Sequence, residues 1–127
     1  MKYYYKKETR GTFEETLEKT KSELAKAGFG ILTEIDVKAT LKEKLDKEYD
    51  RYIILGACNP PLAYKALMAE KDIGLLLPCN VLVYEDESKT YVSAIVPSVA
   101  MSMVENPSLG EIAKEVDEKL KSVVDAV

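Results

Sequence analysis

The sequence contains no histidine and no tryptophan, and only two of its 127 residues are cysteines. Without histidine, the chain lacks the side chain most used for acid–base catalysis near neutral pH, so a Ser–His or Cys–His mechanism within one chain is excluded. Two cysteines supply only half of a tetrahedral zinc site, and their spacing matches no Cys-x-x-Cys pattern. We therefore expect no metal and no cofactor in one chain. A four-thiolate site shared across a two-fold dimer stays geometrically conceivable.

Long apolar runs and glycine-rich phosphate loops are also missing. No apolar run approaches the roughly 18 residues that span a bilayer, and residues 1–10 lack the apolar stretch of a secretory signal. Gly28-Phe-Gly30 has no third glycine, so no dinucleotide fingerprint is present. The chain has 22 acidic against 18 basic residues, which disfavours binding to a phosphate backbone. We expect a cytoplasmic protein with two free thiols and with neither a nucleic-acid nor a membrane partner.

What the chain does have is the composition of an ordinary globular domain, with 46% hydrophobic and 31% charged residues. Residues 2–7 are rich in tyrosine and predict a strand. Thr12 and Glu15 form a capping-box pattern, and apolar residues at helical spacing follow until Gly28, which predicts an amphipathic helix. Phe29–Val37 alternates and predicts a half-buried strand. Its predicted buried face carries Phe29, Ile31, Thr33, Ile35 and Val37.

The middle of the chain predicts two helices around one strand. Lys38–Lys47 is charged, with two leucines four residues apart, and predicts a brief surface helix. Tyr52–Cys58 is almost continuously apolar, as expected of a strand buried on both faces in the middle of a sheet. Asn59 followed by proline is a strong helix start, so we expect a helix over Pro60–Glu70. Gly74–Pro78 is apolar and ends in proline, which favours an extended or irregular buried segment.

The last third predicts a hairpin and a long helix. Cys79–Glu85 and Thr90–Val96 are predicted strands, and the polar residues 86–89 between them have the length of a hairpin loop. Ser108 and Glu111 make a second capping-box pattern. An apolar stripe at helical spacing then predicts a helix to the end of the sequence. The stripe consists of Leu109, Ile112, Val116, Leu120, Val123 and Val127.

The predicted order of elements is β-α-β-(α)-β-α-β-β-α, with no linker long enough to separate two domains. We therefore expect residues 1–127 to form a single domain. This order predicts the α+β class, arranged as a two-layer sandwich. The sheet is expected to be mixed or mostly antiparallel, with about five strands and with helices chiefly on one face.

Two Cys-Asn dipeptides, Cys58-Asn59 and Cys79-Asn80, stand where predicted strands end or begin. Free cysteine is often a buried small hydrophobe, so simple packing explains either thiol. The functional reading is that Cys58 precedes a helix start, where amide groups and the helix dipole favour a thiolate. Tyr64 and Tyr84 could line a pocket beside the cysteines, although ordinary packing explains both tyrosines equally well.

Whether the two cysteines meet depends on the return path of the chain. The helix after Cys58 carries the chain roughly 16 Å away, and an extended segment before Cys79 would return it by roughly 20 Å. If that segment is extended, both cysteines lie at one end of an antiparallel pair. If it is not, they lie at opposite ends.

Three stretches, Gly28–Val37, Ile54–Ala63 and Leu75–Val83, resemble a family of small bacterial and archaeal proteins known only as domain of unknown function three hundred and two. The two Cys-Asn motifs lie within the second and third stretches, and the resemblance covers about Tyr4 to Met103. It implies a compact α+β domain, commonly a homodimer, without an established activity. It places any family site at Cys58, Asn59, Cys79 and Asn80.

Three function classes stay open at this point. The leading hypothesis is a non-catalytic homodimeric module with a small-ligand pocket near the Cys-Asn motifs. Its dimer interface could use the apolar stretch Pro97–Val104. The first alternative is a thiol-dependent enzyme or redox protein that uses Cys58, and the second is a structural assembly subunit.

Overall fold

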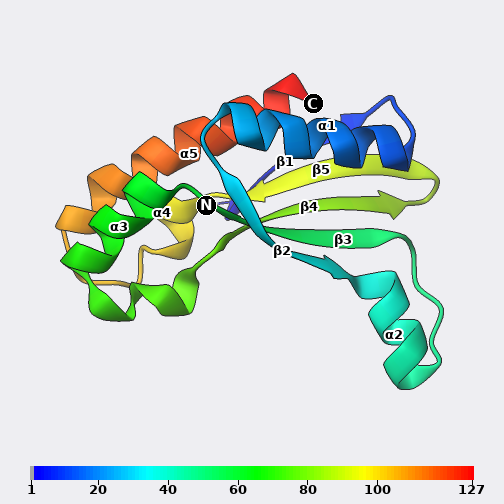
Figure 1. Cartoon of the computed structure of the whole chain (residues 1–127), viewed down its shortest axis with the longest axis horizontal. Coiled ribbons are helices and arrows are strands. Elements are labelled where there is room, and N and C mark those ends of the chain that lie inside the picture. Colours follow the sequence, from blue (N-terminus) through cyan, green and yellow to red (C-terminus); the bar gives the residue numbers. More distant parts are fainter. Residues whose placement is uncertain (1) are drawn as a thin grey trace.

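The computed structural model describes residues 2–127 and confirms the predicted fold class (Figure 1). Five strands form one sheet in the order β1-β5-β4-β3-β2, and every neighbouring pair is antiparallel. Helices α1 and α5 lie side by side across one face of this sheet (Figure 1). The strands are β1 (Tyr4–Thr9), β2 (Gly30–Asp36), β3 (Tyr52–Cys58), β4 (Cys79–Asp86) and β5 (Lys89–Ile95). The helices are α1 (Phe13–Lys26), α2 (Val37–Leu45), α3 (Pro60–Ala69), the 3₁₀ helix η1 (Lys71–Leu76), α4 (Pro97–Ala100) and α5 (Ser108–Ala126).

Helix α1 begins and ends where its local sequence predicts. The Glu15 amide donates to Thr12 Oγ1 at 3.1 Å, and the Thr12 amide donates back to Glu15 Oε1 at 3.0 Å, which completes the capping box. At the other end, Gly28 adopts a φ of 88°, and the Phe29 amide then donates to the Leu24 carbonyl at 2.9 Å. The left-handed glycine therefore turns the chain into β2.

The core fills the layer between the sheet and the helices α1 and α5. Side chains on one face of the central strands are fully enclosed, including Val81, Val83 and Val92 at 0% exposure. Leu24 of α1 and Leu120 of α5 meet them from the helical layer. Because strand side chains alternate between faces, the next residue along each strand points to the opposite side of the sheet.

Strand β2 departs from the predicted half-buried alternation. Its register shifts between Ile31 and Thr33, so one extra residue enters the strand at this bulge. Ile31 stays on the helix-covered face, but Thr33 and Ile35 turn to the other face, and Ile35 is 46% exposed. The strand also lies at an edge of the sheet. The prediction of one buried face from Phe29 to Val37 is therefore wrong beyond the bulge.

Strand β3 is an interior strand, but it is buried on one face instead of two. Leu55 is 0% exposed beneath the helices, whereas Tyr52 and Ile54 on the opposite face are half-buried. The reason is that α1 and α5, the two long helices that pack on the strands, cover the same side of the sheet (Figure 1). The near-continuous apolar run of β3 therefore supplies two apolar faces, of which the helices cover only one.

Two local predictions in the second half of the chain are wrong. Part of the segment predicted as extended or irregular, Gly74–Pro78, lies in the 3₁₀ helix η1, and Leu75 is 85% exposed, not buried. The second capping box does not form either. Pro107 takes a helical conformation, and the Ser108 amide donates to Asn106 Oδ1 at 3.0 Å. The helix start is therefore capped by Asn106, and Ser108 is already inside α5.

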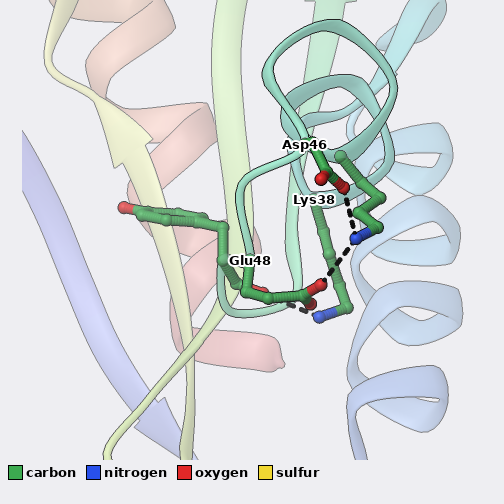
Figure 2. Close-up of polar contacts among 5 residues, drawn as sticks. Lys38, Asp46 and Glu48 are labelled. Carbon is green, nitrogen blue, oxygen red and sulfur yellow. Dashed lines mark hydrogen bonds and ion pairs between the residues drawn. The ribbon is translucent and has the colours of Figure 1, made fainter.

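Helix α2 extends from the end of β2 away from the rest of the chain, and none of its residues is buried (Figure 1). Figure 2 shows how the loop that follows is held. Lys42 Nζ lies 2.6 Å from Asp46 Oδ1 and 3.1 Å from Glu48 Oε1, while Lys38 Nζ donates to the Tyr49 carbonyl at 2.7 Å. Exposed ion pairs of this kind contribute little to stability, so they order the loop without anchoring it to the core.

Candidate functional site

The two Cys-Asn motifs meet at one end of the sheet. Strands β3 and β4 are antiparallel neighbours, and Ala57 pairs directly with Cys79, so Cys58 follows the pairing partner of Cys79 by one residue. The sequence predicted this arrangement only for an extended return segment, yet the chain returns through η1. Helix α3 and η1 together bring the chain back to the same end of the sheet.

A small cavity lies beside both thiols. Its volume is about 30 Å³, which is room for about one or two water molecules. The walls come from β3, α3, β4 and α5, and they include Cys58, Asn59, Cys79 and Met101. Apart from Asn59, the lining side chains are apolar or sulfur-bearing, and none of them carries a charge. As it stands, this cavity is too small for an organic ligand.

A larger groove adjoins this cavity, between η1 and α4. Its volume is about 230 Å³. Five residues line both spaces, so the groove and the cavity share a wall: Leu77, Pro78, Cys79, Pro97 and Met101. The remaining lining residues are Leu75, Leu76, Asn80, Ile95 and Ala100. Asn80, which is exposed, supplies the one amide side chain among them.

Cys79 sits in the wall between the groove and the cavity and is 8% exposed. Burial, and to a smaller extent the nearby Cys58 and Asp117, raises the pKa of the Cys79 thiol to about 11. The thiol is therefore protonated at neutral pH. A protonated, buried thiol is a poor nucleophile, so Cys79 behaves as a packing residue.

The helix start after Cys58 offers no free amide to a thiolate. Pro60 and Pro61 occupy the first two helical positions and have no N–H group. The Leu62 amide donates to the Asn59 side chain at 3.4 Å, and the next amide donates to the Asn59 carbonyl at 2.9 Å. Asn59 is thus the predicted N-cap. The first-turn donors invoked for an activated Cys58 are either missing or already used.

The two tyrosines proposed beside the cysteines lie elsewhere. Tyr64 is 66% exposed on α3 and lines neither the cavity nor the groove. Tyr84 lies near the other end of β4, where it stacks on Tyr52 with ring centroids 5.2 Å apart. The structure therefore brings Cys58, Asn59, Cys79 and Asn80 together and separates Tyr64 and Tyr84 from them.

Asp117 is a site residue that sequence reasoning missed. It is 8% exposed on α5, and its Oδ1 accepts a hydrogen bond from the Ser98 amide at 3.0 Å. The N-cap residue of α4 is Val96, which has no side-chain acceptor, so Asp117 satisfies the α4 amide from another helix. A signal was present in the sequence, because Asp117 follows Ala113 by four residues and precedes Leu120 by three. This spacing places a carboxylate on the core-facing stripe of α5.

Residues 2–127 contain no group of three or more His, Cys, Asp or Glu side chains arranged to hold a metal ion. In the same described range, no helix is both long enough and apolar enough to cross a membrane.

Comparison with known proteins places the chain in a family. The family model described as "Domain of unknown function DUF302" matches residues 5–127. The chain is also similar to the uncharacterized conserved protein DUF302 from Bacillus stearothermophilus, whose crystal structure superposes with a TM-score of 0.92 at 29% identity, over 98% of this chain and 97% of the other. No curated protein matches the chain. The family match spans nearly the whole chain, and the protein is a member of the DUF302 family.

Proposed function

We propose that this chain is a non-catalytic, homodimeric module that binds a small, uncharged and largely apolar molecule in the groove between η1 and α4. The observation that carries this proposal is the shared wall between the 230 Å³ groove and the small cavity beside the thiols. A ligand that pushes Met101 aside gains access from one space to the other. Met101 is well suited to this movement, because its unbranched side chain adapts its shape at low cost.

The size of the groove limits the ligand. Pockets for drug-sized molecules run from about 300 to 1,000 Å³, and apolar cavities of about 150 Å³ already bind benzene. A groove of about 230 Å³ therefore suits a chain or ring of about six carbons. Leu75 forms part of its margin and is 85% exposed, which leaves apolar surface for a ligand to cover.

The lining of the groove also disfavours charged ligands. None of the residues that line the groove is charged, so a carboxylate or an ammonium placed there would lose hydration without gaining a partner. Asn80 offers an amide that both donates and accepts hydrogen bonds. The expected ligand therefore carries a hydroxyl or carbonyl group at one end of an apolar body.

The cellular setting belongs to the same proposal. Cys58 and Cys79 lie at the same end of two adjacent strands, and both carry free thiols. Neighbouring cysteines that stay unpaired suit a reducing compartment. We therefore place the module in the cytoplasm, with thiols that pack against the site and do not react.

Titration with hexan-1-ol and with hexanoate tests the ligand, with binding followed by amide NMR shifts. Burial of six carbons favours binding of hexan-1-ol with a dissociation constant on the order of 1 mM. Hexanoate should bind at least about tenfold more weakly, because its carboxylate finds no cation in the groove. Equal binding of the two probes would contradict the charge argument.

A blocking variant locates the binding. Ala100→Phe fills the groove from α4, whereas Ala25→Phe adds the same ring at an exposed position on α1. We expect loss of hexan-1-ol binding in the first variant and unchanged binding in the second. If hexan-1-ol does not bind the native protein while the dimer is intact, the ligand proposal fails, and a structural assembly subunit becomes the better description.

A further inference from the structure

The face of the sheet opposite α1 and α5 carries aromatic and aliphatic side chains at its centre, and within residues 2–127 neither of these helices covers it. Two rows of side chains cross it from strand to strand, each set by the register of the sheet. One row is Tyr52, Tyr84 and Tyr91, and the other is Ile35, Ile54 and Leu82. All six side chains stay at least partly exposed, while residues between them in sequence, such as Val83, are fully buried on the helical side.

Stacking and contacts with Lys6 hold the tyrosine row in place. The Tyr52 and Tyr84 rings stack with centroids 5.2 Å apart, and the Tyr84 and Tyr91 rings stack at 5.4 Å. Lys6 Nζ lies 5.2 Å from the Tyr91 ring centroid and donates to the Tyr84 hydroxyl at 3.2 Å. The rings are therefore fixed side by side. Fixed aromatic side chains with polar tips are the residues most enriched in protein interfaces.

Charged residues of both signs lie on this face, and the Lys6 side chain reaches from the edge strand to the Tyr84 hydroxyl of the middle strand. Lys6 and Glu8 lie on the edge strand β1, and Asp86 and Lys89 lie at the tip of the β4–β5 hairpin. An apolar centre with a mixed polar rim is the anatomy of a protein–protein interface. Because both signs are present, the face does not repel a second copy of itself.

The dimensions also suit a second copy. Five strands spaced about 4.8 Å apart, with six residues each at about 3.3 Å, give a face of about 24 by 20 Å. Two such faces bury about 1,000 Å² as a flat footprint, which lies at the lower limit for a specific interface before the relief of the side chains is counted. Sheets commonly pack face to face in this way, about 10 Å apart.

We infer that this uncovered sheet face is the interface of the homodimer, with two copies packed face to face about a two-fold axis near Leu82. Leu82 lies in the middle strand β4 and pairs with Ile54, so it occupies the centre of the face. A two-fold axis that lies between the two faces at this point brings Leu82 against its symmetry mate. This inference rests on the homodimer in the proposed function and names its surface.

The stretch Pro97–Val104, which the sequence suggested as an interface, offers much less surface. Pro97 is buried, and Met101 and Val104 pack against a small core cluster with Leu109. Met103 alone among the large apolar side chains of this stretch is strongly exposed, at 72%. The apolar character of the stretch is thus largely accounted for by packing within the chain.

Sedimentation of the full-length protein and two lysine variants tests the interface. Leu82→Lys places a charge at the proposed two-fold axis, and Met103→Lys places the same charge on the competing surface. We expect the native protein and Met103→Lys to be dimers at micromolar concentration. We expect Leu82→Lys to dissociate with a dimer dissociation constant raised at least about tenfold. The reverse pattern, with Met103→Lys dissociated and Leu82→Lys dimeric, would overturn the interface and leave the homodimer standing.

Nitration of tyrosines in the native protein gives a second measurement that does not depend on a variant folding. Tyr52, Tyr84 and Tyr91 should be protected when the protein concentration is raised, whereas Tyr64, which is 66% exposed on α3, should react equally at all concentrations. Concentration-independent reaction of all four tyrosines overturns the interface. If the native protein is monomeric at all concentrations, the homodimer of the proposed function is contradicted as well. The hexan-1-ol titration tests ligand binding separately.

Discussion

The buried Cys79 thiol makes the stability of this fold depend on pH in the alkaline range. Its pKa is raised from an ordinary value of 9.0 to about 11 in the folded chain, first by burial and then by the neighbouring Cys58. The unfolded chain therefore releases the thiol proton at a lower pH than the folded chain does. The contribution of Cys79 to stability is complete below pH 9 and is lost as the pH rises through 11.

The difference between the two pKa values corresponds to about 3 kcal/mol of unfolding free energy. This is a large effect, because the whole unfolding free energy of a domain is about 5 to 15 kcal/mol. Other groups titrate in the same range, so the absolute stability of the native protein does not isolate the cysteine. Comparison with Cys79→Ala isolates it, because the variant keeps every other titrating side chain.

The assay is urea-induced unfolding of the native protein and Cys79→Ala at a series of pH values. The native protein should be more stable below pH 9, and this advantage should shrink by about 2 kcal/mol between pH 9 and 11 and by about 3 kcal/mol in total once the folded-state thiol has also ionised. Cys58→Ala should keep most of the pH dependence, because burial is the larger cause of the raised pKa. If the difference in unfolding free energy between the native protein and Cys79→Ala stays constant across this range, the pKa of Cys79 is not raised in the folded chain.

Three further substitutions test the packing and capping described above. Gly56→Ala places a Cβ that overlaps Thr33 Oγ1 and lies 2.9 Å from Pro78 Cγ, so it should lower the unfolding free energy by about 1 to 3 kcal/mol, and Thr33→Ala should recover part of that loss in the double variant. Asp117→Ala leaves the α4 amide without its acceptor and should cost about 1 to 3 kcal/mol, whereas Asp117→Asn keeps an acceptor oxygen and should cost clearly less. Thr12→Ala removes half of the capping box and should cost about 1 kcal/mol. Chemical denaturation measures all of these values, and equal stability of the two Asp117 variants would contradict the role assigned to that carboxylate.

Local signals predicted the elements whose ends are fixed by neighbouring residues. Thr12, Glu15 and Gly28 set the two ends of α1 through hydrogen bonds within a few residues, so the sequence contains the whole interaction. Asn59 predicted the start of α3 for the same reason. The bulge in β2 could not be predicted, because it is defined by the pairing with β3 and reverses the faces of Thr33 and all later residues.

The site was predicted in part. The sequence identified both Cys-Asn motifs, but their meeting depended on the path through η1, whose exposed Leu75 resembled a core residue in the sequence. Asp117 escaped notice because charged residues in helices usually face solvent, and its partner Ser98 is distant in sequence. The uncovered face could not be predicted from the apolar run of β3, because an apolar run does not indicate which face of the strand is covered by helices.

Intermolecular nuclear Overhauser effects between hexan-1-ol and the methionine methyl groups test whether the ligand binds in the groove between η1 and α4. Met101 lines the groove, whereas Met103 is 72% exposed and lines neither the groove nor the cavity, so the two methyl groups form an internal control. The account predicts contacts from the alkyl chain to Met101 and to the Cys79 β-protons, and none to Met103. Contacts to Met103 without contacts to Met101 would contradict the proposed binding site.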